Sequence, residues 1–327
     1  MTANQAPLIS VVLVAHCDSG NLRLAINRLK SQTIADRLEL ILVTERRKNL
    51  EAVEPALSGF LRVQTVEVGD MRAPGAAKAA GVRSASAPLV AFVEDHSYPA
   101  PDCAEALVAA HADGKYAAVG PVVLNANPAT AASWACYLIF YSAWMPGAAC
   151  ADADHLPGNQ SCYRRDLLMS YGSRLEEVLG SESVLHWELR SKGHKLRLEA
   201  RALLYHLQFS ARRPVWKEYF LASRAFAADR ASQWGAARRA AFALGSPLLP
   251  AIRLPRIWRQ AVKSGTGRVL LARSLPDMLA VLGAGTAGEM MGYALGPGDA
   301  ARRLIEFERT RHLDFTRRDL DAATRIL

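Results

Sequence analysis

Short runs of apolar, often β-branched residues alternate with amphipathic stretches along the first 120 residues. The strand-like runs are residues 9–15, 38–44, 63–68, 88–93 and 117–124. The helix-like segments between them are residues 22–29, 51–61, 76–85 and 104–111. Strands separated by helices of about ten residues predict βαβ units and a mainly parallel sheet covered on both faces. We therefore expect an α/β fold.

The ends of the predicted strands are the first place to look for a site, because ligands of parallel sheets bind at the carboxyl ends of the strands. Polar residues follow Ala15, Thr44 and Val93 at three such ends. A dinucleotide site needs GxGxxG after the first strand, but residues 15–20 read AHCDSG. The loop at residues 265–267 lacks the GKS ending of a P-loop. The pattern argues against NAD binding and P-loop hydrolysis.

Composition narrows the class of protein further. The chain has 327 residues, and 50% of them are hydrophobic, which excludes a disordered chain and allows one large domain or a domain with an appendage. Its 5 cysteines have no tight spacing, so they indicate reduced thiols rather than a disulfide framework or structural zinc. Residues 1–8 lack a basic region, and the apolar run after them is too short for a signal peptide. We expect a cytoplasmic protein.

The positive charge of the chain is concentrated in its last third. Residues 1–210 hold 20 Lys and Arg against 21 Asp and Glu, whereas residues 211–327 hold 20 against 10. The latter segment is also apolar. A basic and apolar segment favours an anionic membrane surface as its partner over nucleic acid. Solvated arginines without a partner are the alternative.

The same last third is predicted to be mainly helical. Residues 125–175 read as loop-rich, and residues 214–242 as helical. Residues 275–296 are nearly all apolar but contain two acids and several glycines. About 20 apolar residues would span a bilayer, yet acids make a free-standing span costly. We expect helices lying in the membrane interface, with a buried helical hairpin packed on the catalytic domain as the alternative.

The order of segments in the first two thirds is distinctive. The strand ISVVLVAH, a helix ending in SQT and the strand LELILVT precede GAAKAAGVRSASAPLVAFVEDH and the turn SYPAPD. This order resembles that of the family 2 glycosyltransferases, including membrane-associated bacterial members. The resemblance spans roughly residues 8–210. It implies a GT-A fold with a Rossmann-like mixed sheet, a catalytic domain at residues 1–211 and a helical, membrane-associated extension at residues 212–327.

On the donor side, the resemblance implies contacts with a nucleoside-diphosphate sugar, UDP before GDP or dTDP. Main-chain atoms of Ala15 and His16 and the carboxylate of Glu45 would line the nucleobase. Lys78 stands where the family has an Arg facing the diphosphate, and a positive charge there offsets phosphate charge. The neighbouring Asn of the family is Ala79 here, which is a departure.

The triplet Glu94-Asp95-His96 stands where the family has its acidic metal motif. The resemblance implies that Asp95 and His96 hold a divalent metal together with His206, and that Glu94 and Asp95 belong to the donor site. Divalent cations such as Mg²⁺ want oxygen ligands, whereas imidazole suits Mn²⁺ better. A histidine in the triplet therefore favours Mn²⁺ over Mg²⁺.

Two later segments resemble the acceptor side of the family. Gly158, Asn159, Gln160 and Arg164 lie in a loop that would contact the acceptor. Glu182 takes the place of the family's general base, which accepts the proton of the attacking hydroxyl.

Together these residues imply an inverting hexosyltransferase (EC 2.4) that acts by a single displacement. A membrane-apposed tail favours a lipid or lipid-linked saccharide as the hydroxyl acceptor, on the inner face of the plasma membrane. Glu188 is a weaker candidate for the base. The rival hypothesis is a non-catalytic glycosyltransferase-like binding or assembly subunit, because His96 and Ser181 stand where the family has acids. A nucleotidyltransferase is a third hypothesis, but its glycine-rich basic loop is not visible after the first strand.

Overall fold

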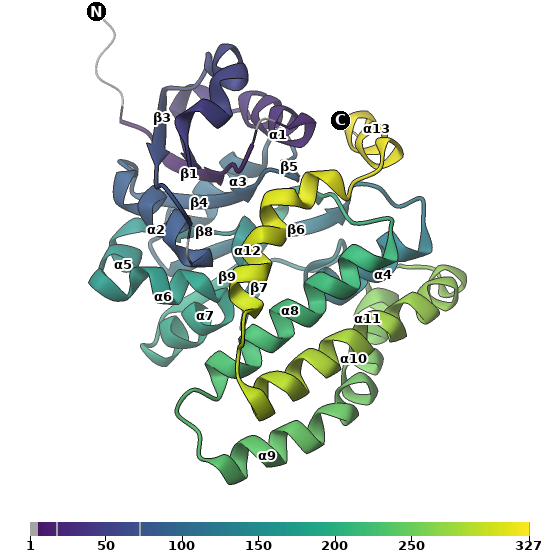
Figure 1. Cartoon of the computed structure of the whole chain (residues 1–327). Helices are drawn as coiled ribbons and strands as arrows, with labels where there is room; N and C mark the ends of the chain where they lie inside the picture. Colours follow the sequence, from purple (N-terminus) through teal and green to yellow (C-terminus); the bar gives the residue numbers. More distant parts are fainter. Residues whose placement is uncertain (1–5, 18, 72, 327) are drawn as a thin grey trace, which may run out of the picture. The chain divides into compact units, whose positions relative to one another are not determined.

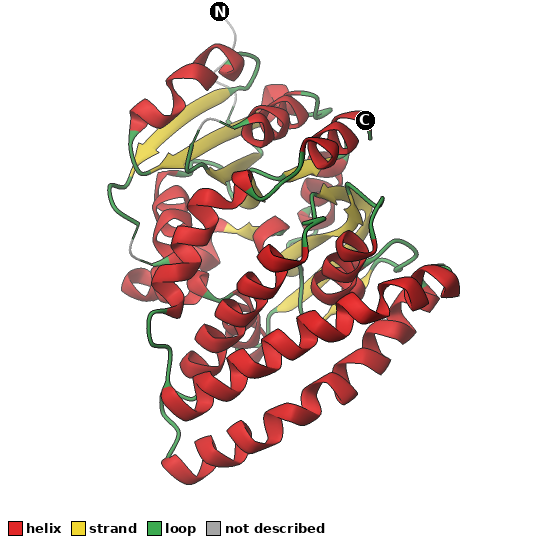
Figure 2. Cartoon of the chain, turned by 45° about the vertical axis from the view of Figure 1, so that its right-hand side comes forward, coloured by secondary structure: helices red, strands yellow, loops and turns green. Residues whose placement is uncertain are grey.

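A computed structural model describes residues 6–17, 19–71 and 73–326. The described chain forms two compact units. The first contains the residues up to 124 together with 148–206, and the second contains 125–147 and 207–326. Figure 2 shows the strands gathered in the first unit, whereas the second is built from helices.

The first unit is built on one mixed sheet (Figure 1). Its strands are β1 (Ile9–Val14), β2 (Leu38–Thr44), β3 (Arg62–Glu67), β4 (Leu89–Glu94), β5 (Ser97–Pro99), β6 (Tyr116–Asn125), β7 (Ala151–Ala153), β8 (Cys162–Arg164) and β9 (Lys195–His206). The order across the sheet is β3-β2-β1-β4-β8-β6-β9-β5, and β7 pairs with β9. Strands β1 to β4 pair in parallel, whereas β8 runs antiparallel to β4 and β6. The predicted mixed α/β sheet is confirmed, but the mainly parallel sheet expected from the alternation of strands and helices is not, because β8 and β9 pair antiparallel with their neighbours.

Helices connect these strands within the first unit. They are α1 (Gly20–Lys30), α2 (Pro74–Ser84), α3 (Cys103–His111), α5 (Arg165–Met169), α6 (Leu175–Gly180) and α7 (Glu182–Ser191). Short 3-10 helices lie at η1 (Ala35–Arg37), η2 (Arg47–Leu57), η4 (Gly158–Gln160) and η5 (Gly172–Arg174). The helix predicted at residues 51–61 is thus η2, which is wound more tightly than an α-helix and starts earlier.

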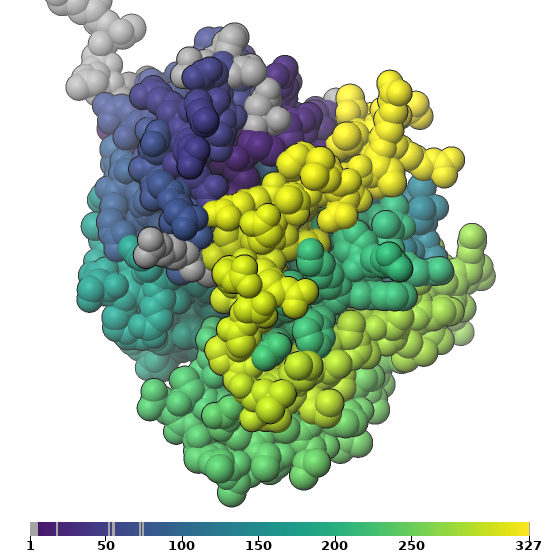
Figure 3. Space-filling view, in the orientation of Figure 1, coloured from purple at the N-terminus to yellow at the C-terminus, as the bar shows by residue number. Residues whose placement is uncertain are grey.

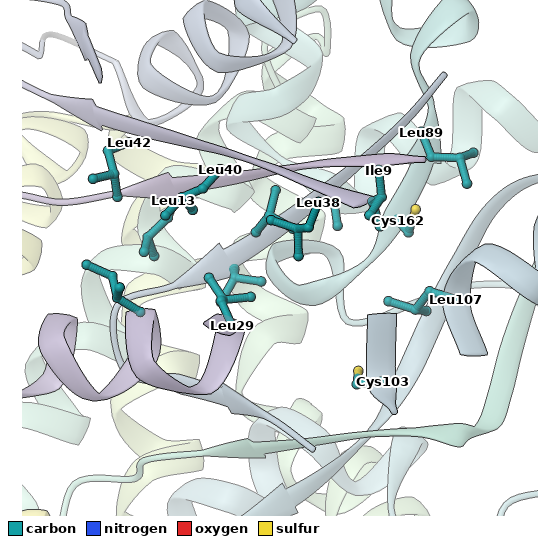
Figure 4. Packing of buried hydrophobic residues seen from close by; sticks show 14 of the residues in the cluster. Ile9, Leu13, Leu29, Leu38, Leu40, Leu42, Leu89, Cys103, Leu107 and Cys162 are labelled. Atoms are coloured by element: carbon teal, nitrogen blue, oxygen red, sulfur yellow. The ribbon is translucent and has the colours of Figure 1, made fainter. Parts of the chain in front are cut away.

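The main hydrophobic core lies between one face of the sheet and helices α1 and α3 (Figure 4). Successive side chains of a strand point to opposite faces, so alternate residues such as Ile9 and Leu13 of β1 and Leu40 of β2 enter this core. Helix α1 contributes Leu29, and α3 contributes Leu107. Burying alternate residues fixes the register of the strands, because a slip by one residue would turn these side chains to the other face.

A buried carboxylate on β2 ties the sheet to the chain after α2. Glu39 is fully buried and accepts hydrogen bonds from Ser10 Oγ (2.5 Å), Ser86 N (2.8 Å) and Gln64 Nε2 (2.7 Å). Burial alone would raise the pKa of Glu39, but these hydrogen bonds outweigh it and hold the pKa below its ordinary value. The network fixes β1, β2 and β3 relative to the start of β4.

The second unit is a helical assembly. Its helices are α4 (Ala131–Tyr141), α8 (Arg212–Arg230), α9 (Ala236–Gly245), α10 (Leu249–Lys263), α11 (Arg268–Leu295), α12 (Ala300–Thr310) and α13 (Arg317–Arg325), with 3-10 turns η3 (Ser142–Trp144), η6 (Ser246–Leu248) and η7 (Arg311–Leu313). Helix α4 falls in the segment predicted to be loop-rich, and it packs against α11. The division expected at residue 211 therefore missed residues 125–147. The single helical stretch expected at residues 214–242 is two helices, α8 and α9, separated by residues 231–235.

Helix α11 contains the apolar stretch at residues 275–296. By length and composition it is long and apolar enough to cross a membrane. It packs along α8, however, and its two acids have arginine partners: Asp277 contacts Arg212, and Glu289 contacts Arg253. Paired acids and close packing against α8 argue against a free-standing span.

Glycines of α11 allow its close approach to α8. A Cβ added at Gly288 would overlap the carbonyl oxygen of Phe220, whereas a Cβ at Gly283 would meet nothing within 4 Å.

We predict that Gly288→Ala lowers the free energy of unfolding by about 1–3 kcal/mol, because the backbone of α8 must move. Gly283→Ala is the matched control and should be neutral or stabilising by up to ~1 kcal/mol. Thermal unfolding measures both variants. A melting temperature of Gly288→Ala equal to that of Gly283→Ala would contradict the close packing of α11 on α8.

Candidate active site

The topology brings several predicted residues to one edge of the sheet. In the parallel register, Val14 of β1 lies opposite Val43 of β2 and Glu94 of β4. The residues that follow these strands, Ala15 and His16, Glu45, and Glu94 itself, therefore meet at the carboxyl edge. This is the edge at which such sheets bind ligands.

Residues on the β1–β2 side of this edge are held by main-chain hydrogen bonds. The amide of Ala15 donates to Val43 O (2.8 Å), and Asn49 Nδ2 donates to His16 O (3.1 Å). Glu45 Oε1 accepts from the amide of Met71 (3.3 Å). The half-buried Glu45 is thus positioned by the chain that leads into α2. The predicted nucleobase contacts lie together, as expected from the strand order.

Three side chains from two strand ends converge next to them. The chain turns after β4 directly into β5, which pairs with the end of β9 so that Ser97 lies opposite His206. Ligand atoms of Glu94, His96 and His206 all lie within 4.8 Å of one another. His206 Nε2 is 3.1 Å from Glu94 Oε2, and His96 Nε2 is 3.8 Å from the same oxygen. Both imidazoles are buried and their rings meet edge to face.

Asp95 was predicted to be a metal ligand, but the structure does not place it among the three clustered side chains. Asp95 and His96 form the turn between β4 and β5, and this turn brings His96 back beside Glu94 in the cluster. The Asp95 carboxylate instead contacts His96 Nδ1 (2.8 Å). A carboxylate can only accept, so Nδ1 carries the proton and Nε2 is left for a cation. Asp95 orients a ligand, in the manner of the outer shell of metal sites.

The donor set of this cluster fits a divalent transition metal. One carboxylate and two imidazoles are ligands that Mn²⁺ accepts, whereas Mg²⁺ prefers oxygen alone. A metal site requires converging ligands, and a half-buried carboxylate and two buried imidazoles converge here. Asp95 also orients one of the imidazoles, His96, as outer residues of metal sites do. Glu94, His96 and His206 are therefore the residues that would hold such an ion.

The loop before β8 supplies polar partners for Glu94. Strand β8 runs antiparallel to β4, and Phe92 N donates to Ser161 O (3.1 Å), which places η4 beside the end of β4. Asn159 Nδ2 donates to Glu94 Oε1 (2.8 Å), and Gln160 Nε2 donates to Glu94 Oε2. The predicted acceptor-side residues Asn159 and Gln160 thus touch the carboxylate of the cluster directly.

A lysine links this cluster to the predicted base. Lys78, from α2, contacts both Asn159 Oδ1 and the Glu182 carboxylate. Its side chain is only 17% exposed, so the ion pair is partly shielded from solvent. Glu94, Asn159, Lys78 and Glu182 therefore form one continuous series of polar contacts. Sequence reasoning assigned all four to one site, but it did not predict that they touch.

Glu182 is fixed by the helix it begins. It is the first residue of α7, where a negative charge interacts favourably with the helix dipole. A Cβ added at Gly158 would overlap the Glu182 side chain. A glycine at this position therefore allows the loop of η4 to lie against the Glu182 side chain.

Two buried residues behind Glu182 were not predicted. His186, one turn further along α7, contacts Tyr163 OH through Nε2 (2.9 Å), and the two rings stack. Burial lowers the pKa of His186 to about 4, so its imidazole is neutral at pH 7. The only signal in the sequence was the spacing of four residues from Glu182, which puts His186 on the same face of a helix.

Two other candidates lie away from this group. Arg164, predicted to contact the acceptor, pairs across the strands with Leu89, at the opposite end of β4 from Glu94, and forms an ion pair with Asp166 (2.5 Å). We therefore remove Arg164 from the site. Glu188 is engaged by Arg174 (2.6 Å).

Comparisons with known proteins bear on the family of the sequence. The model of the family "Glycosyl transferase family 2" matches residues 10–171. No curated protein matches the chain in sequence.

Similar solved structures include the mannosyltransferase PcManGT from Pyrobaculum calidifontis in complex with GDP-Man and Mn²⁺, with 16% identity, a TM-score of 0.48 and coverage of 98% of this chain and 86% of that one. GalNAc-T7 with UDP, GalNAc and Mn²⁺ has 14% identity, a TM-score of 0.48 and coverage of 61% and 42%. S. aureus TarS has 11% identity, a TM-score of 0.47 and coverage of 86% and 55%. The chain thus spans about half the length of the latter two.

The neutral, buried His186 makes stability depend on pH. Between pH 6.5 and about 4 the unfolded chain binds a proton at this residue that the folded chain does not, so stability falls as the pH falls through this window. From pH 7 to pH 5 we expect His186 to cost roughly 2 kcal/mol of the free energy of unfolding. Urea unfolding at pH 7 and pH 5 measures this drop. The free energy of unfolding of His186→Gln should fall by roughly 2 kcal/mol less between the two pH values than that of the wild type. Parallel losses in both proteins would contradict a neutral His186.

Proposed function

This chain belongs, through its residues 10–171, to glycosyl transferase family 2, and we propose that it moves a sugar from a UDP-sugar to a hydroxyl acceptor in a metal-dependent single displacement with inversion. Transfer of a sugar from a nucleotide sugar (EC 2.4) is the activity of its family. The nucleotide, the metal, the stereochemistry and the residue roles are our proposal.

The observation that carries the proposal is the series of contacts from Glu94 through Asn159 and Lys78 to Glu182. One end of this series is a cluster of metal-binding side chains, and the other is a carboxylate at a helix terminus. A nucleoside-diphosphate transferase needs both: positive charge for the leaving diphosphate and a base for the attacking hydroxyl. Here the cluster and the carboxylate of Glu182 are linked by the side chains of Asn159 and Lys78.

Glu94, His96 and His206 would hold the ion, and we expect Mn²⁺ rather than Mg²⁺ because two of the three ligands are imidazoles. A bound divalent ion offsets the negative charge that develops on a departing diphosphate. Lys78 adds a second positive charge close by, since it reaches the Asn159 that touches Glu94. Ala15, His16 and Glu45, at the adjoining strand ends, would contact the uracil and ribose.

Glu182 would act as the base. The acceptor oxygen attacks the anomeric carbon and forms the new C–O bond, while the bond from that carbon to the diphosphate oxygen breaks. The hydroxyl proton passes to the Glu182 carboxylate. An inverting transfer needs one such base on the face opposite the leaving group.

Lys78 gives this base an ionic partner. Its ammonium group contacts Glu182 and Asn159. The phosphates of a donor would compete with Glu182 for the same ammonium group, because both are anions that pair with lysine. Donor binding would then free the carboxylate for the acceptor hydroxyl, so that the donor binds before the acceptor.

The alternative of a non-catalytic subunit rested on His96 and Ser181 in place of acids. His96 is itself one of the three clustered metal-binding side chains, so its presence no longer argues against a metal. Ser181, the residue before α7, is the remaining departure.

Replacing the base tests the reaction. We predict that Glu182→Gln lowers kcat at least ~100-fold, because the amide cannot accept the proton, whereas Glu188→Gln, on the same helix, stays near wild type because Glu188 pairs with Arg174. The assay is release of UDP from a panel of UDP-sugars in the presence of Mn²⁺, with water as the acceptor. Folding of both variants is checked by their melting temperatures.

Full turnover by Glu182→Gln would remove Glu182 as the base. Release of GDP or dTDP from the corresponding sugars, but not of UDP, would overturn the choice of nucleotide. Absence of turnover in the wild type with every donor would favour the non-catalytic subunit.

A further inference from the structure

Helices α9 and α10 of the second unit present large apolar side chains to solvent. Leu244, Leu248 and Ile252 are 82%, 65% and 65% exposed. They recur every four residues through α9, η6 and α10, a spacing that keeps side chains on one side of a helical run. Figure 3 shows α9, in green, uncovered at the surface. A row of exposed leucine and isoleucine marks an interaction surface rather than scattered surface apolar residues.

The same side of α10 becomes basic one turn after Ile252. Arg256, Arg259 and Lys263 follow at helical spacing and are all exposed. The whole stretch 236–263 contains 6 Lys and Arg and no Asp or Glu. Two of the remaining arginines point into the unit, where Arg239 binds Tyr293 O (2.9 Å) and Arg253 contacts Glu289. The exposed cations are therefore not needed to neutralise acids of their own helix.

We propose that this surface, Leu244, Leu248, Ile252, Arg256, Arg259 and Lys263, lies on an anionic lipid bilayer. An amphipathic helix in the interface buries its apolar side chains at the boundary of the acyl chains and places Lys and Arg among acidic head groups. A second copy of this chain is a poorer occupant, because self-association would bring like charges together.

This surface lies within residues 212–327, the segment expected from the sequence at a membrane interface. The apolar stretch at residues 275–296 lies in α11, which buries Met278, Val281 and Leu282 but exposes Leu279, Met290 and Leu295. Unlike this stretch, the row of exposed apolar residues on α9, η6 and α10 continues into three exposed cations. Attachment would thus be peripheral, through helices lying along the bilayer, and it does not depend on the donor, the metal or the base.

Vesicle sedimentation of the full chain tests this inference. We predict binding to vesicles of phosphatidylglycerol and phosphatidylcholine, much weaker binding to phosphatidylcholine alone, and a loss of binding as salt is raised. Leu248→Gln with Ile252→Gln should weaken binding at least about tenfold, and Arg256→Gln with Arg259→Gln about fivefold or more. Both pairs are exposed, so the fold should persist. Leu313→Gln, which removes a side chain that is 72% exposed elsewhere in the unit, is the control and should bind like the wild type.

Equal binding to neutral and anionic vesicles, or wild-type binding by the Leu248/Ile252 variant, would overturn the proposal. A concentration-dependent dimer that this variant abolishes, without vesicle binding by the wild type, would assign the surface to a second copy. Loss of binding in the Leu313 control would point to a general effect of surface polarity and would also overturn it.

Discussion

The Glu94 carboxylate is the group on which the candidate site depends. It ends a central parallel strand, and it contacts His206 from β9 together with Asn159 and Gln160 from the loop before β8. A carboxylate that is largely removed from water needs hydrogen bonds and positive charge. Two separate segments supply these, and so the charge of one side chain organises the edge of the sheet.

The same requirement explains why the base and the metal cluster are not independent. Asn159 uses its amide nitrogen for Glu94 and its amide oxygen for Lys78, and Lys78 in turn contacts Glu182. An anion that binds near Glu94 therefore changes the surroundings of Glu182 through two side chains. Gly158 contributes by lacking a side chain, since any Cβ there would displace Glu182.

Much of the first unit could be predicted from its sequence, because buried parallel strands are short, apolar and regularly spaced, as Ile9–Val14 and Leu38–Thr44 are. The convergence of strand ends followed from that order. What could not be predicted depends on contacts distant in sequence. Asp95 was chosen over Glu94 because the triplet alone does not say which acid faces His206, and Arg164 was included because nothing local shows that β8 carries it to the far end of β4. Helix α4 was missed although Thr130 caps its start, because its nearly continuous apolar residues show no helical period.

The most direct test of the central claim is calorimetric titration of UDP into the protein with Mn²⁺ or with a chelator, in the wild type, Glu94→Gln and Asp95→Asn. The account predicts that the wild type binds UDP tightly only with Mn²⁺ and that Glu94→Gln loses this dependence on the metal. Asp95→Asn should keep it with about 10–100-fold weaker metal affinity, because Asp95 only orients His96. Binding of UDP that is equally strong with Mn²⁺ and chelator, or unchanged in Glu94→Gln, would contradict a metal site built around Glu94.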